Sequence, residues 1–130
     1  MSKTFIISGA VAGLLAVLLG AFAAHALREH LTPGSLAAFK TGVQYQMTHA
    51  LALVAVGILV RLIPAQHQGL KVLCWSGGFF MAGIILFSGS LYLLVLLKMS
   101  WLGPVTPVGG LALMLGWFML ALGAYRLRPY

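Results

Sequence analysis

The stretch of sequence that decides the fold is residues 20–49. It reads GAFAAHALREHL (20–31) and continues as TPGSLAAFKTGVQYQMTH (32–49). It carries the only acidic residue of the chain, Glu29, and three of the four histidines, His25, His30 and His49. Long apolar runs lie on both sides of it. The stretch therefore separates two hydrophobic segments and gathers most of the polar chemistry of the chain between them.

The amino-acid composition is that of a membrane protein. Of the 130 residues 62% are hydrophobic, and the charged residues are eight Lys or Arg and one acidic residue. A soluble domain of this size needs a charged surface, so the long apolar runs are predicted to be membrane spans. The net charge of +7 does not indicate nucleic-acid binding, because the basic residues stand singly at the ends of apolar runs, where lipid headgroups attract them.

Four apolar segments predict an all-α membrane protein that is a single domain, a four-transmembrane-helix bundle. About 20 helical residues cross the roughly 30 Å of hydrocarbon in a bilayer. The expected spans are residues 5–24, 43–63, 72–97 and 107–125. A cleaved signal peptide is the weaker interpretation of the first segment, since its apolar run is longer than a typical signal core.

Two Thr-Pro pairs are predicted to begin helices, because Thr is a good N-cap and Pro fits the first helical position. After Thr32-Pro33, apolar side chains recur at helical spacing. This pattern predicts a short amphipathic interfacial helix between the first two spans. The second pair, Thr106-Pro107, is expected to begin the fourth span.

The second span draws polar side chains into the membrane. Its apolar run covers only residues 50–60, which is too short to cross a bilayer, so the helix must begin near Val43. Polar groups in the outer part of the membrane are costly unless they face the bundle and find partners. The polar residues placed there are Gln44, Tyr45, Gln46 and His49.

The distribution of Lys and Arg along this multi-pass chain favours both termini in the cytoplasm. Five basic residues fall on the terminal side (Lys3, Arg61, Lys71, Arg126 and Arg128), and three on the opposite side (Arg28, Lys40 and Lys98). This topology gathers polar side chains at the outer side. The candidate ligand-binding residues there are His25, Glu29, Gln44, Tyr45, Gln46, His49, Ser88, Ser90 and Tyr92.

The histidines and Glu29 allow several interpretations. His25 and Glu29 are spaced i, i+4 and would share one face of a continuing helix, as a polar cap in which Arg28 or Lys40 pairs with Glu29. Alternatively, His25 and His49 are facing ligands of a haem iron, or they join Glu29 or His30 in a divalent-metal site. A pH-responsive cluster is a further interpretation, because His titrates near neutral pH.

The glycines indicate close helix packing. Gly9 and Gly13 form a G-x-x-x-G pattern, and Gly109, Gly116 and Gly123 recur seven residues apart. Small residues let helix backbones approach each other in lipid. We expect this packing to lie inside the bundle rather than at a dimer interface.

No catalytic motif is evident, since the sequence lacks G-x-S-x-G, a Gly-rich phosphate loop and H-E-x-x-H. The leading hypothesis is a non-enzymatic membrane protein that supports membrane or envelope organisation or the assembly of a larger membrane complex. The alternatives are a haem-, metal- or small-ligand-binding bundle and a small oligomeric transporter or channel. The expected partners are the lipid bilayer and a membrane protein or further copies of the chain, and no particular cofactor is indicated.

Four segments carry a family resemblance: GAFAAHAL (20–27), FKTGVQYQM followed by HAL (39–51), FSGSLY (87–92) and GPVTPVGG (103–110). In them the chain resembles the small membrane proteins grouped as domain of unknown function 423, whose eukaryotic relatives are called transmembrane protein 256. The resemblance covers nearly the whole chain, and its one departure is Ala23 where the family usually has Gly. It implies a compact helical protein of the bacterial inner membrane and implies no activity.

Overall fold

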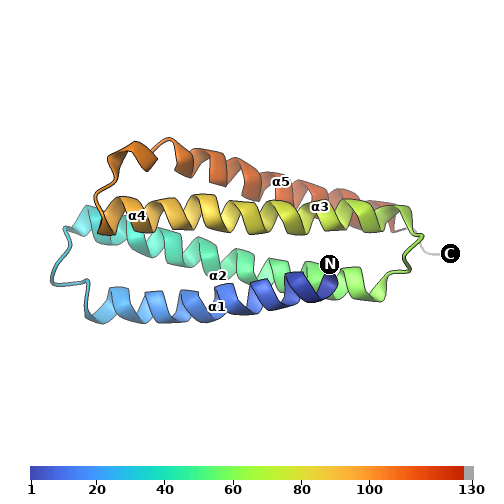
Figure 1. The fold of residues 1–130 in the computed structure, drawn as a ribbon, viewed down its shortest axis with the longest axis horizontal. Coiled ribbons are helices and arrows are strands. Elements are labelled where there is room, and N and C mark those ends of the chain that lie inside the picture. Colours follow the sequence, from blue (N-terminus) through green and yellow to red (C-terminus); the bar gives the residue numbers. More distant parts are fainter. Residues whose placement is uncertain (128–130) are drawn as a thin grey trace.

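The computed structural model describes residues 1–127, and within that range every element is helical (Figure 1). The elements are α1 (Ser2–His25), α2 (Pro33–Leu62), α3 (Gln68–Gly83), the π-helical segment η1 (Ile84–Gly89), α4 (Ser90–Leu96), the 3-10 turn η2 (Ser100–Leu102) and α5 (Val105–Arg126). Since α3, η1 and α4 follow one another without a break, the helical segments form four long rods. All four are long and apolar enough to cross a membrane, which confirms the predicted four-span bundle.

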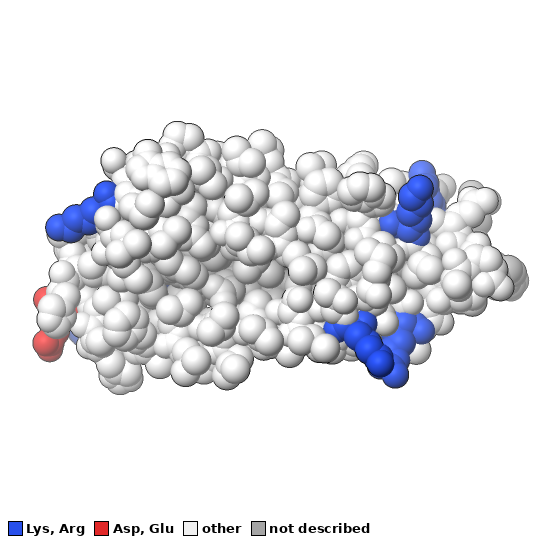
Figure 2. Space-filling view, viewed as in Figure 1, with Lys and Arg blue, Asp and Glu red and all other residues white. Residues whose placement is uncertain are grey.

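The rods lie side by side, and the start of α1 and the end of α5 lie toward the same end of the bundle, the terminal end (Figure 1). Lys and Arg side chains gather near the two ends, and the flank between them is free of charge on the face shown in Figure 2. This distribution is the one expected for a protein whose middle is surrounded by hydrocarbon. Arg128, one of the five basic residues assigned to the terminal side, lies outside the described residues.

The helix α2 begins where the first Thr-Pro pair predicts. The Thr32 hydroxyl accepts a hydrogen bond from the Ser35 N–H at 3.2 Å, and Pro33 is the first helical residue. The expected interfacial helix is not a separate element, because α2 continues unbroken from Pro33 to Leu62. No proline interrupts this segment, so nothing ends the first turns before the span.

The second Thr-Pro prediction is wrong. The helix α5 begins at Val105, and its N-cap is Pro104 without a side-chain cap. Thr106 therefore lies inside the helix, where its hydroxyl pairs with that of Ser90. The preceding rod ends at Leu96, followed by Lys98 at a φ of 51°. A residue in this left-handed region is a common way to terminate a helix.

Helix packing pairs α1 with α2 and α3 with α5 most extensively. Glycines line these contacts: a Cβ on Gly9 would lie 2.8 Å from the Ala50 carbonyl oxygen, and one on Gly109 would meet the backbone of Phe87. The glycines named by the sequence pattern thus serve contacts within the bundle. The rods α1 and α3 meet near the terminal end, where Phe5 packs on Gly77.

Candidate functional site

The polar side chains of α2 divide into a buried pair and an exposed pair. Gln46 and His49 are 4% and 5% exposed, whereas Gln44 and Tyr45 face outward. The buried pair lies at the middle of Pro33–Leu62, deeper than the outer position expected from the sequence. The difference follows from the earlier start of α2, which places about ten more residues before Val43.

His49 is held between α2 and α5. Its Nδ1 donates to the Tyr45 carbonyl oxygen at 2.6 Å, and its Nε2 accepts from the Trp117 indole Nε1–H at 3.0 Å. A carbonyl only accepts and an indole N–H only donates, so the ring is the neutral Nδ1–H tautomer. Both ring nitrogens are used, and neither is available to a metal or a haem iron unless a bond within the bundle breaks.

Gln46 joins three helices. Its Nε2 donates to the Ala12 carbonyl oxygen of α1 at 2.8 Å, and its Oε1 accepts from the Tyr92 hydroxyl of α4 at 2.6 Å. A helical side chain leans toward the N-terminus of its helix, so the Tyr92 phenol points back toward the middle of the rod. Ala12 lies nearly at the midpoint of α1. The three groups form a hydrogen-bonded cluster at mid-depth of the bundle.

The hydroxyls of Ser88 and Ser90 form hydrogen bonds between helices, nearer the end of the bundle that carries the α1–α2 loop. The Ser88 hydroxyl donates to the Gly42 carbonyl oxygen at 2.7 Å, and the hydroxyls of Ser90 and Thr106 are 2.6 Å apart. Within residues 1–127, no buried side-chain nitrogen or oxygen lacks a hydrogen-bond partner. Since unpaired polar groups are costly in lipid, this network stabilises the packing of the four rods.

The structure does not bring His25, Glu29 and His49 together. The helix α1 ends at His25, so Glu29 lies in the following turn and not on the same helical face. Gly20 of α1 lies beside Val43 of α2. Because the two helices are antiparallel, His25 and His49 are separated along the bundle by about 16 Å at 1.5 Å per residue. Residues 1–127 contain no group of three or more His, Cys, Asp or Glu that could hold a metal ion.

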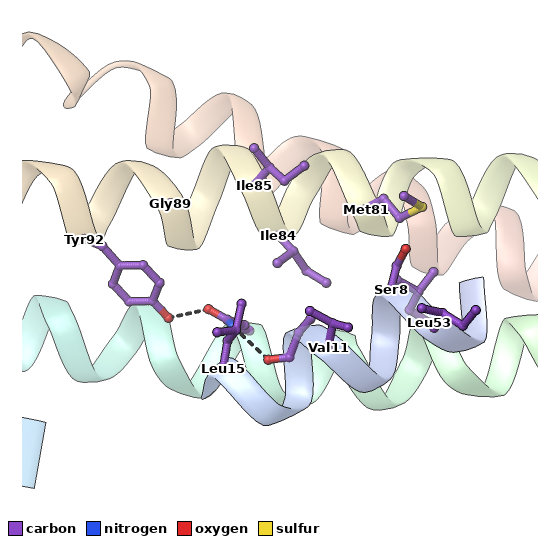
Figure 3. Close-up of a pocket in the computed structure, with 12 residues that line it drawn as sticks. Ser8, Val11, Leu15, Leu53, Met81, Ile84, Ile85, Gly89 and Tyr92 are labelled. Carbon is purple, nitrogen blue, oxygen red and sulfur yellow. Dashed lines mark hydrogen bonds between the residues drawn. The ribbon is translucent and has the colours of Figure 1, made fainter. Parts of the chain in front are cut away.

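A groove of about 480 Å³ runs between α1 and the α3–η1–α4 rod (Figure 3). Val11 and Leu15 of α1 form one side and Ile84 and Ile85 of η1 the other, and the bonded Tyr92 hydroxyl lies at one end. Val11, Leu15 and Ile85 are among the exposed side chains, so the groove opens to the surroundings of the bundle. Its further lining residues are Ile7, Ser8, Ala12, Gln46, Leu53, Met81 and Gly89.

A second groove of about 380 Å³ lies between α2 and α5. His49 and Trp117 belong to its lining, together with the exposed Gln44 and Tyr45. The Tyr45 ring packs on Phe87, with centroids 4.6 Å apart. The structure thus distributes the candidate residues of α2 over two sides of that helix.

Sequence reasoning missed two partners in these networks. Trp117 donates to His49, and the main-chain oxygen of Ala12 accepts from Gln46. The sequence did offer a signal for Trp117, because the indole N–H of a tryptophan inside a span needs a hydrogen-bond acceptor. Ala12 offered no signal, because a main-chain oxygen becomes an acceptor only through helix register.

Comparison with known proteins gives consistent relatives. The family model described as protein of unknown function (DUF423) matches residues 19–110. The chain is 44% identical over 124 residues to the UPF0382 membrane protein YwdK of Bacillus subtilis, covering 95% of this chain and 98% of that protein. It is 35% identical over 128 residues to the UPF0382 inner membrane protein YgdD of Escherichia coli, covering 98% and 93%.

No solved structure matches the chain. The family model covers more than half of the chain, and the relatives match along almost their whole length. The names of these relatives describe membrane proteins, in agreement with the four apolar rods. The chain therefore belongs to the DUF423 family of small multi-pass membrane proteins.

Proposed function

We propose that the protein is a non-enzymatic component of the bacterial inner membrane that supports membrane organisation or the assembly of a larger membrane complex. The observation that carries this proposal is the use of the polar interior. His49, Ser88 and Ser90 bond to other groups of the bundle. Side chains that bond to one another in this way stabilise the bundle. The surface that remains for contact with a partner is the lateral, lipid-facing one.

The proposed orientation has both termini in the cytoplasm. It is supported by Lys3, Arg61, Lys71 and Arg126, which lie toward the end of the bundle that carries the termini. A reporter enzyme fused after Arg126 that is active only in the periplasm should stay inactive. An active reporter at that position would reverse the orientation.

The assembly role is tested by isolating the tagged protein from its own membrane in a mild detergent, with native mass spectrometry as the readout. We expect a mass above that of the single chain. Leu14→Trp on α1 and Met114→Trp on α5 form a matched pair, since both residues are 61% exposed. Loss of the assembly in one variant only would locate its contact face. A protein always isolated alone, whose deletion leaves membrane complexes and lipid composition unchanged, would contradict the proposal.

A second candidate function is a small-ligand-binding bundle. The observation that favours it is the groove between α1 and the α3–η1–α4 rod, because Gln46 and Tyr92 lie at its polar end. Its volume of about 480 Å³ is within the range of about 300–1,000 Å³ usual for small-molecule sites.

A further inference from the structure

We infer that the groove between α1 and the α3–η1–α4 rod binds a neutral lipophile with a carbonyl oxygen, such as a quinone, which enters laterally from the bilayer. This inference deepens the ligand-binding candidate and is independent of the assembly role. Three features of the groove carry it: a spare hydrogen-bond donor, its depth in the membrane and its open apolar walls.

The spare donor belongs to Gln46. A carboxamide nitrogen has two N–H bonds, and one of them goes to the Ala12 carbonyl oxygen. No other acceptor for Gln46 Nε2 is found among the described residues. Gln46 lines the groove and is 4% exposed, so this donor is screened from competing water. A ligand oxygen that accepts there would complete the hydrogen bonding of the amide.

The depth of the donor selects the kind of lipid. The Gln46 amide meets Ala12 near the midpoint of α1. Half of the hydrocarbon thickness is about 15 Å, so phospholipid headgroups and their ester oxygens lie far above this level. Only a molecule dissolved entirely in the hydrocarbon brings a carbonyl oxygen to it. A charged ligand is excluded because ionised groups are costly at this depth.

The walls fit a lipophile. Ile84 points toward Val11 and Leu15 across the groove (Figure 3), and the exposed Ile85 also belongs to its lining. Apolar side chains attract a hydrocarbon body no better than lipid chains do, so packing and the single hydrogen bond must supply the preference. The polar end then acts as the element that distinguishes a carbonyl-bearing molecule from the surrounding acyl chains.

Two glycines on one rod offer a matched pair of variants. A Cβ at Gly89 or at Gly78 would meet nothing within 4 Å. Gly89 lines the groove, whereas Gly78 is absent from its lining. Gly89→Leu should therefore fill the groove without disturbing the bundle, and Gly78→Leu should add the same bulk outside it. Gln46→Met tests the donor itself with a side chain of similar volume.

The experiment measures binding of a short-chain alkyl benzoquinone to the purified full chain in mild detergent, by native mass spectrometry over a ligand titration. We expect wild type and Gly78→Leu to bind alike, Gly89→Leu to lose binding, and Gln46→Met to bind about tenfold more weakly through loss of one shielded hydrogen bond. An alkylbenzene with the same tail and no oxygen should bind at least about tenfold more weakly than the quinone.

Three results would overturn the inference: no binding to the wild type, equal binding to Gly89→Leu, or equal affinity for the alkylbenzene. The last result would mean that the groove holds any hydrocarbon chain. None of these outcomes bears on the assembly role, whose readout is the mass of the complex isolated without added ligand.

Discussion

The two sides of α2 use their buried polar side chains differently. On the α5 side, His49 has two ring nitrogens and two partners. On the α1 side, Gln46 has four hydrogen-bonding positions and engages two groups. Both residues are almost fully buried, so burial does not distinguish them. A buried polar side chain in a membrane bundle is available to a ligand only where it has more hydrogen-bonding positions than the neighbouring helices occupy.

The largest expected effect would displace α5, which carries Trp117, the partner of His49. In Gly109→Ala, the new Cβ would meet the backbone of η1 at Leu86 and Phe87, so α5 must move away from the rod. Overpacking of this kind costs about 1–3 kcal/mol. The measurement is the unfolding free energy in a detergent–SDS titration.

Gly110→Ala is the control for that variant, because its Cβ would lie 3.7 Å from the Phe87 ring, an ordinary contact. We expect it to unfold like the wild type. Equal stability of the two alanine variants would show that α5 is not held closely against η1.

A smaller effect is expected when His49 loses one of its two partners, which leaves it with unused hydrogen-bonding capacity, as Gln46 has. Trp117→Phe removes the donor to His49 Nε2 and leaves that nitrogen with an unused acceptor position. We expect a loss of about 1 kcal/mol in the same titration, within the range of up to about 1.7 kcal/mol for hydrogen bonds inside membrane proteins. Trp75→Phe is the control, since Trp75 is 58% exposed and its ring packs on Phe79. A cost no greater than that of the control would argue against the His49–Trp117 bond.

The smallest effect is expected on the α1 side of α2, where the hydrogen bond between Tyr92 and Gln46 is tested. Tyr92→Phe removes the donor to Gln46 Oε1 and keeps the ring, which packs on Phe39 with centroids 5.0 Å apart. Hydrogen bonds inside membrane proteins contribute about 0.6 kcal/mol on average, and we expect a loss of that size in unfolding free energy. Tyr45→Phe on the exposed side of α2 should change nothing. A larger cost for Tyr45→Phe would reverse the assignment of the two tyrosines.

Most of the fold could be predicted because hydrophobic length and helix caps are local properties of the sequence. The presence of four spans and the Thr32-Pro33 cap are confirmed. The start of α5 was misjudged because Thr106 has a competing partner, Ser90, that lies on another rod. A cap prediction considers only the neighbours in the sequence, and a hydroxyl in lipid bonds to the acceptor that packing brings closest.

The site could be predicted less well, because depth and register depend on the whole length of a helix. Gln44, Tyr45, Gln46 and His49 were all predicted to face the bundle. Gln46 and His49 are buried, whereas for Gln44 and Tyr45 the prediction is wrong, because both are exposed. The mid-depth position of Gln46 and His49 required knowing that α2 begins at Pro33. The register of α1 against α2 also separates His25 from His49, although the sequence alone permitted them to face each other.

The π-helical segment Ile84–Gly89 also changes the direction in which the side chains of its rod point. A π-turn takes more residues than an α-turn, so the side chains beyond it are rotated relative to an uninterrupted helix by roughly the 100° that one α-helical residue spans. Before the shift the rod presents Phe80 to the core, and after it Ser90 and Val95 are the buried side chains. One continuous helix thereby presents two differently oriented faces to its neighbours, and losing a single residue within the segment would rotate Tyr92 away from Gln46.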